Sequence, residues 1–141
     1  MSERSFLVDS VPTSDPIPVM LESPYSGDIE LNVFYARLCL QDSCERGEAP
    51  FPTHLVYTQI PSGTYVSDDD AARRVMSREH GLQRGFVWRN LCKRTVFYVD
   101  EGMSSGMLRA EAEAIRGGHV VERRLLPRWQ EIKAEWISSR G

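Results

Sequence analysis

The stretch that decides the fold is Leu21-Glu22-Ser23-Pro24-Tyr25-Ser26-Gly27-Asp28-Ile29-Glu30. A short apolar run, Val19-Met20-Leu21, leads into it, and a long amphipathic pattern follows it. The residues between the two, which include Pro, Tyr, Ser, Gly and Asp, are typical of a tight turn. The sequence therefore predicts a strand, a sharp loop and the start of a helix.

The loop 23–28 has two interpretations. In an open α/β sheet, ligands bind where a strand passes into the next helix. The helix N-terminus offers unpaired N–H groups and partial positive charge, which suit a phosphate or another oxygen-rich group. The alternative is that Ser26 or Asp28 only caps the helix.

Composition limits the class of protein. The chain has 141 residues, of which 41% are hydrophobic and 26% charged, as expected for one globular domain with a real core. The net charge of -3 argues against nucleic-acid backbone as the main partner. No stretch approaches the roughly 20 apolar residues of a membrane helix, and residues 1–15 do not resemble a signal peptide.

The three cysteines bear on compartment and metal binding. Cys39, Cys44 and Cys92 form an odd set without C-x-x-C spacing. This pattern favours a reduced cytoplasmic protein over a disulfide scaffold or a zinc site. We expect no metal site and no cofactor.

Strands and helices alternate along the chain, which implies a parallel, doubly wound sheet. We expect strands at 18–22, 48–55, 95–99 and 119–123. Because proline is poorly tolerated in central strands, the prolines of the second segment should lie at a strand end or a bulge. We expect helices at 29–46, 71–92 and 108–116, and a last helix with Pro127 as its first residue. The domain plan is an arm at 1–15, one domain at 16–126 and a C-terminal helix at 127–141.

Two loops are expected to face each other, because the carboxyl ends of parallel strands meet at one edge. These are the loops 23–28 and 100–107. Both are rich in Ser and Gly and precede a helix, so their N–H groups and hydroxyls can hold a sugar-phosphate. Neither matches a P-loop or G-x-G-x-x-G.

A carboxylate beside a bound sugar could act as nucleophile or general acid in glycosyl transfer. The acids near the two loops are Glu22, Asp28, Asp100, Glu101, Glu111 and Glu113. Each has an alternative role as a helix cap, a turn residue or a solvated side chain.

Several aromatic side chains and a histidine also have two interpretations. His54 could contact a ligand at this edge, or it is a packed or surface histidine. Tyr25 could stack on a base or donate its hydroxyl, or it only closes the turn. Trp88, Trp129 and Trp136 are predicted to lie in the core or at a subunit interface.

Several motifs occur together in one order over residues 17–124. They are Ser23-Pro24-Tyr25-Ser26-Gly27-Asp28, Asn32 with Ala36-Arg37, Arg46-Gly47-Glu48-Ala49-Pro50-Phe51-Pro52-Thr53-His54-Leu55-Val56-Tyr57-Thr58-Gln59, Gly85-Phe86-Val87-Trp88, the strand 95–98, and Ser104-Ser105-Gly106-Met107. On these residues the chain resembles nucleoside 2-deoxyribosyltransferase-like proteins. More narrowly, it is similar to a poorly characterised branch of that superfamily, common in bacteriophages and bacteria.

The resemblance implies a flavodoxin-like, three-layer α/β/α fold in a single domain. It also implies a nucleoside or nucleotide ligand between the first and last loops, a homo-oligomer, and a cytoplasmic location (host cytoplasm if phage-encoded). Active members cleave or transfer the N-glycosidic bond, with a Glu nucleophile on the helix after the S-x-G-M-like loop. The expected catalytic residues are Glu111, Asp100 and Tyr25. The expected ligand contacts are Ser23, Ser26, Gly27, Asp28, His54, Ser104, Ser105, Gly106 and Met107.

Two positions depart from the family pattern. Ala110 stands at the ungapped position of the nucleophile, and Glu111 is one step further, which turns a side chain by about 100° on a helix. Gln83 stands where an acid is expected. The sequence therefore predicts an N-glycosidic hydrolase or deoxyribosyltransferase, with a catalytically silent nucleotide-binding protein as the alternative. A structural or partner-binding protein is a third interpretation.

Overall fold

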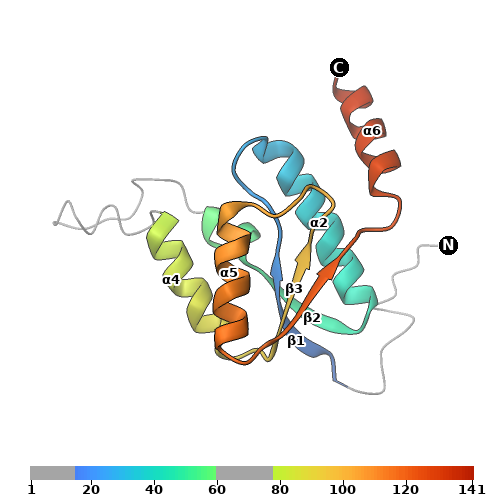
Figure 1. Cartoon of the computed structure of the whole chain (residues 1–141). Helices are drawn as coiled ribbons and strands as arrows, with labels where there is room; N and C mark the ends of the chain where they lie inside the picture. Colours follow the sequence, from blue (N-terminus) through green and yellow to red (C-terminus); the bar gives the residue numbers. More distant parts are fainter. Residues whose placement is uncertain (1–14, 60–77) are drawn as a thin grey trace.

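The computed structural model of the chain describes residues 15–59 and 78–141, with the side chains of 15–58 and 83–141 (Figure 1). Its strands are β1 (Ile17–Glu22), β2 (Glu48–Pro52), β3 (Arg94–Tyr98) and β4 (Val120–Arg124). Its α-helices are α2 (Ile29–Glu45), α4 (Arg78–Arg89), α5 (Ser105–Arg116) and α6 (Trp129–Arg140). Two short 3-10 turns, η1 (Thr53–Leu55) and η2 (Tyr57–Gln59), follow β2.

The four strands form one all-parallel sheet in the order β2-β1-β3-β4. Helix α2 covers one face of this sheet, and α4 and α5 cover the other (Figure 1). The expected doubly wound, three-layer α/β/α fold in a single domain is confirmed. The strand order is that of flavodoxin-like sheets.

Alternation along β1 sends its side chains to the two faces of the sheet. Val19 and Leu21 pack with Tyr35 of α2 in the larger core cluster. Met20 and Glu22 have the opposite parity and are also buried. The α4/α5 face therefore receives a buried carboxyl group at the end of β1.

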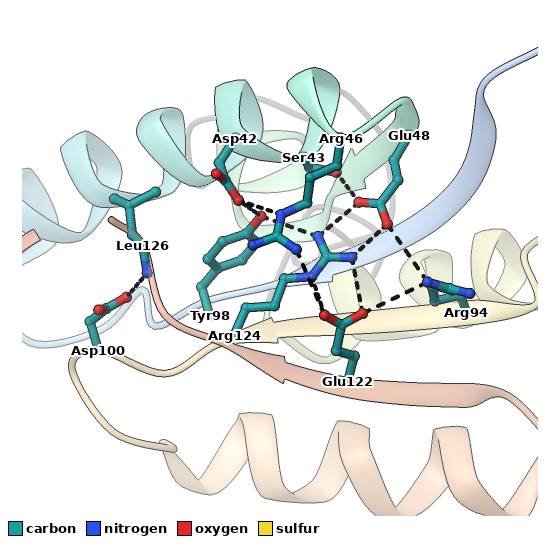
Figure 2. A network of polar contacts seen from close by, with 10 residues as sticks. All are labelled: Asp42, Ser43, Arg46, Glu48, Arg94, Tyr98, Asp100, Glu122, Arg124 and Leu126. Carbon is teal, nitrogen blue, oxygen red and sulfur yellow. Dashed lines mark hydrogen bonds and ion pairs between the residues drawn. The ribbon is translucent and has the colours of Figure 1, made fainter. Parts of the chain in front are cut away.

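A network of charged side chains lies on the α2 face of the sheet (Figure 2). Arg124 of β4 donates to both carboxylate oxygens of Glu48 at 2.8 and 2.5 Å, and the two side chains are only 3% and 6% exposed. Ser43 donates to the same carboxylate at 2.7 Å, and Tyr98 donates to Asp42 at 2.6 Å. The network joins the C-terminal half of α2 to β2, β3 and β4.

Two helix starts differ from the expectation. Helix α5 begins at Ser105, three residues earlier than expected, because the Ser104 hydroxyl caps it by accepting from the Met107 N–H at 3.2 Å. Helix α6 begins at Trp129, so the prediction that Pro127 is its first residue is wrong. Arg128 has a φ of +62°, a left-handed conformation that precedes the helix.

The second strand is shorter than expected, ending at Pro52 rather than at residue 55. It is an edge strand, where prolines are tolerated because one side of the strand needs no donors. Among the tryptophans, Trp129 is buried, while Trp88 is 41% exposed and does not belong to the core. The expected helical residues 71–77, residues 60–70 and most of the arm at 1–15 lie outside the described residues.

Candidate functional site

The sheet has one topological switch point, between β1 and β3. The chain leaves β1 toward β2 on one side, whereas β3 pairs with β1 on the other. In such sheets a crevice opens outside the carboxyl ends of the two strands. The loops that follow β1 and β3 meet this edge, as the sequence predicted.

Both loops turn at a glycine that lies in the left-handed region. Gly27 has a φ of +100° and Gly102 a φ of +86°. Side chains rarely adopt this conformation, so the path of each loop depends on its glycine. The loops then lead into the N-termini of α2 and α5, which direct N–H groups toward this edge.

Asn32 of α2 holds the loop 23–28 in place. Its side-chain amide donates to the carbonyl oxygens of Tyr25 and Ser26 at 2.9 and 3.1 Å. Ser23 is buried, while Ser26, Gly27 and Asp28 are exposed. Asp28 accepts from the Leu31 N–H at 3.2 Å, so it does cap α2.

Tyr25, predicted as a catalytic residue, and His54, predicted as a ligand contact, lie together. Their rings stack with centroids 5.7 Å apart and an angle of 18° between the planes. Tyr25 comes from the loop after β1 and His54 from η1 after β2. The pair forms an aromatic surface at the carboxyl edge of the sheet, beside the first loop.

Glu22 lies at the end of β1 between two other elements. Its Oε1 accepts from the Thr53 hydroxyl of η1 at 3.1 Å, and its Oε2 is 3.9 Å from the Arg89 guanidinium of α4. Burial raises the pKa of the Glu22 carboxyl to about 7, although the Arg89 charge and the Thr53 hydrogen bond lower it. The sequence placed Glu22 near the site but gave no sign of Thr53 or Arg89.

Asp100 and Glu101, which follow β3, accept hydrogen bonds from residues of α2 and α6 and of the segment before α6. Asp100 Oδ2 accepts from the Tyr35 hydroxyl at 2.6 Å and from the Leu126 N–H at 2.8 Å. Glu101 accepts from the Trp129 indole at 2.7 Å and from Lys133 at 2.9 Å. This pairing ties the end of β3 to α2 and α6.

The predicted contacts of the second loop are divided between core and surface. Ser104 caps α5, and Met107 is buried against Phe97 with Ala110. Ser105 is exposed and Gly106 is half-buried. The exposed start of α5 is thus the part of this loop that faces solvent.

Glu111 points to the edge strand β4. Arg123 donates to both of its carboxylate oxygens at 2.8 and 2.7 Å. These hydrogen bonds hold the pKa of Glu111 below its ordinary value. The partner of Glu111, Arg123, lies on β4, whereas the loop 23–28 follows β1. Strand β3 lies between these two strands.

An aromatic cluster that the sequence did not predict joins β2, η2 and α4. Trp88 stacks on Phe51 of β2 at 5.0 Å and donates its indole N–H to the Tyr57 hydroxyl at 2.9 Å. Trp88 directly precedes Arg89 on α4. The residues of this cluster belong to the motifs at 46–59 and 85–88. Because these motifs are far apart in the sequence, nothing in it indicated that they pack together.

A cavity of about 290 Å³ lies at the C-terminal ends of α4 and α5. Its lining includes Arg89, Asn90, Glu113 and His119. These helix ends lie at the edge of the sheet opposite to the two loops. Arg89 lines this cavity, and its guanidinium also lies 3.9 Å from Glu22.

Within 15–59 and 78–141, no group of three or more His, Cys, Asp or Glu side chains is placed to hold a metal ion. No helix among these residues has the length and apolar character needed to cross a membrane.

Comparison with known proteins gives a family but no activity. The family model of a domain of unknown function, DUF7768, matches residues 17–124, which is more than half of the chain. No curated protein and no solved structure matches the chain.

Proposed function

The chain belongs to the DUF7768 family, and we propose that it binds a nucleoside or nucleotide and cleaves or transfers its N-glycosidic bond. The observation that carries this proposal is the position of the Tyr25–His54 stack. It lies at the carboxyl edge of the sheet, beside the loop at the β1/β3 switch point. A nucleobase has an aromatic face that can stack on such a pair.

The sugar or its phosphate fits the loops on either side of the switch point. Ser26 and Gly27 are exposed, and the loop that carries them is held by Asn32. Ser105 and Gly106 begin α5, so their N–H groups are among those without a partner inside the helix. Hydroxyls and N–H groups from two loops suit an oxygen-rich ligand.

Cleavage of an N-glycosidic bond requires a carboxylate at the sugar and a proton for the departing base. In the nucleoside 2-deoxyribosyltransferase-like proteins that the chain resembles, a Glu on the helix after the second loop attacks the sugar, and we propose Glu111, one step beyond the matching position of Ala110, for this role. In this role Glu111 must exchange its pairing with Arg123 for the substrate. The low pKa of Glu111 suits a nucleophile, since the carboxylate is ionised at neutral pH.

The second candidate is a catalytically silent nucleotide-binding protein. Two observations favour it. Ala110, at the position where the family pattern expects the nucleophile, is buried against Phe97 and Met107. Glu111 is engaged in a two-point ion pair with Arg123.

Turnover and binding assays separate the two. The protein is incubated with deoxynucleosides, ribonucleosides and their 5′-monophosphates, and products are identified by mass spectrometry. An enzyme releases a free base or forms an exchanged nucleoside. A silent binder shows a ligand-dependent rise in melting temperature without products, because binding to the native state alone stabilises it. Neither turnover nor a shift with any compound would overturn both proposals.

We also propose a homo-oligomer, on the same resemblance. Analytical ultracentrifugation at micromolar concentration tests it. A monomer at all concentrations would overturn this part of the proposal without affecting the ligand site.

A further inference from the structure

Among the side chains that the structure describes, two glutamates, Glu22 and Glu48, are buried, and they differ in how well they are paired. Glu48 accepts from Ser43 and from both terminal nitrogens of Arg124, at 2.5–2.8 Å. Among the described residues, Glu22 accepts one hydrogen bond, from Thr53 at 3.1 Å, and lies 3.9 Å from Arg89. A buried structural carboxylate is normally well supplied with donors, so the sparse pairing of Glu22 calls for an explanation.

Arg89 is also incompletely paired. Its side chain is 8% exposed, and its Nε is buried with no hydrogen-bond partner within the described part of the chain. Its guanidinium lies over the Phe86 ring at 4.7 Å. Arg89 thus places a positive charge near Glu22 without forming a direct two-point ion pair.

The charged and titratable neighbours of Glu22 come from two elements. Helix α4 contributes Arg89, which itself experiences the charge of Glu113 on α5. Turn η1 contributes Thr53, with His54 next to it in sequence. On the sheet, the neighbouring position in register is the apolar Phe97. Because burial outweighs these partners, the pKa of Glu22 lies at about 7, and the group exchanges its proton near neutral pH.

Glu22 is also close in sequence to the proposed base-binding surface. It is three residues before Tyr25, and its hydrogen-bond donor Thr53 is the residue before His54. Tyr25 and His54, which are close in sequence to Glu22 and to its donor Thr53, stack on each other. The Glu22 carboxyl therefore contacts the turn η1, which carries the His54 ring of the aromatic pair.

We propose that Glu22 is the general acid and base of this site, a role that rests on the proposed N-glycosidic cleavage. In hydrolysis, the Glu111 carboxylate bonds to C1′ of the sugar as the bond between C1′ and the base nitrogen breaks, and the electron pair of that bond leaves with the base. Glu22 donates its proton to a nitrogen of the departing base. A water molecule then displaces Glu111 from C1′ by supplying a hydroxyl, and the remaining proton of the water returns to Glu22.

N-glycosidic cleavage of this kind uses two carboxyl groups, and this proposal gives Glu111 and Glu22 different roles. Arg123 keeps Glu111 ionised, so Glu111 has no proton to donate at neutral pH. Glu22 can donate one. Two carboxyl groups whose environments push their pKa values apart are a recurring arrangement in acid–base catalysis.

The test compares Glu22→Gln with Glu131→Gln. Gln can still accept the Thr53 hydrogen bond but cannot exchange a proton, and Glu131 lies on an exposed ion pair of α6. With a substrate that the wild type turns over, we expect Glu22→Gln to lower kcat by about 10²–10⁴-fold, the usual range for a general acid or base. Its ligand-dependent rise in melting temperature should persist, and the limb of the kcat pH profile near pH 7 should disappear. Glu131→Gln should match the wild type.

The outcomes distinguish this role from the proposed function. Wild-type turnover that is unchanged in rate and pH profile by Glu22→Gln would overturn the role of Glu22 and leave the function intact. A wild type without turnover would overturn the function and this role with it. Infrared spectroscopy adds a measurement that does not depend on turnover: a protonated carboxyl band present at pH 5, lost by pH 9 and absent from Glu22→Gln is expected. A Glu22 that is already ionised at pH 5 would overturn the role.

Discussion

The Tyr35 hydroxyl donates a 2.6 Å hydrogen bond to Asp100 Oδ2, and the Asp100 N–H donates back to the same hydroxyl oxygen at 3.0 Å. Tyr35 lies in the middle of α2, and Asp100 follows β3. The two-way contact fixes the start of the second loop against the helix that begins at the first loop. The geometry of the switch point therefore depends on a buried phenol.

Tyr35→Phe should destabilise the protein by about 1–3 kcal/mol, because it leaves the Asp100 N–H without an acceptor and its carboxylate without one donor. Urea denaturation followed by tryptophan fluorescence measures the loss. The matched control is Tyr57→Phe, which removes a hydroxyl from an exposed hydrogen bond to Trp88. We expect that change to cost less than about 0.5 kcal/mol. Equal losses in the two variants would contradict the role assigned to Tyr35.

Arg124→Met should cost about 3–5 kcal/mol, because it leaves Glu48 charged and buried without its main donor. The control, Arg116→Met, removes an exposed partner of Glu113 and should change stability by less than about 1 kcal/mol. Chemical denaturation measures both. The double variant Glu48→Met/Arg124→Met should recover part of the loss, since no buried charge remains unpaired. A double variant less stable than Arg124→Met alone would contradict this explanation.

Glu22 and Glu48 should affect the pH dependence of stability in opposite directions. The pKa of Glu22 is raised, so its contribution is complete below the unfolded value of 4.5 and is lost as pH rises through about 7. Relative to wild type, Glu22→Gln should therefore gain up to about 3 kcal/mol between pH 4 and pH 8, as a difference of 2.5 pKa units implies. Urea melts at four pH values measure this. A constant difference across the range would contradict the raised pKa.

Glu48 should show the opposite trend. Burial alone would raise its pKa, but hydrogen bonds from Arg124 and Ser43 outweigh burial and lower it. Its contribution is present above the unfolded value and is lost as pH falls through the folded value. Glu48→Gln should therefore be most destabilising near pH 7 and least destabilising in acid. Thermal melts from pH 3 to pH 7 test the trend, which would be refuted by a loss that grows toward low pH.

Gly27→Ala should weaken ligand binding, and Gly118→Ala should not. Both glycines have a positive φ, +100° and +79°, and an added Cβ meets nothing within 4 Å at either position. Each change should therefore cost about 1 kcal/mol or somewhat more in stability, through backbone strain alone. Of these two glycines, Gly27 lies in a loop at the switch point and Gly118 does not, so Gly27→Ala alone should reduce the ligand-dependent rise in melting temperature. Equal reductions in both variants would place the ligand elsewhere.

The sequence predicted the order of the elements well, because each strand and helix carries its own local pattern. The strand expected at 95–99 lies at 94–98, and the helix expected at 29–46 at 29–45. The alternation of strands and helices also predicted which two loops lie at the same edge of the sheet, on either side of the switch point. These features depend on short-range periodicity and on the handedness of crossover connections.

The contacts of the candidate site were not predictable in the same way. The contacts of Glu22 with Thr53 and Arg89 join three segments far apart in the sequence, and only packing of η1 and α4 on β1 brings them together. Asp100 was predicted as a catalytic residue or a turn residue, and its hydrogen bond to Tyr35 could not be foreseen because the two are 65 residues apart. Pro127 favoured a helix start, but the left-handed Arg128 delays it.

The prolines of β2 affect how copies of this protein can associate. Pro50 and Pro52 have the same parity along an edge strand, so both missing N–H groups belong to the side turned away from β1. A further strand arriving at that edge would find no donors at two successive positions. Continuation of the sheet into a neighbouring molecule is therefore blocked at β2, which protects the protein against edge-to-edge aggregation.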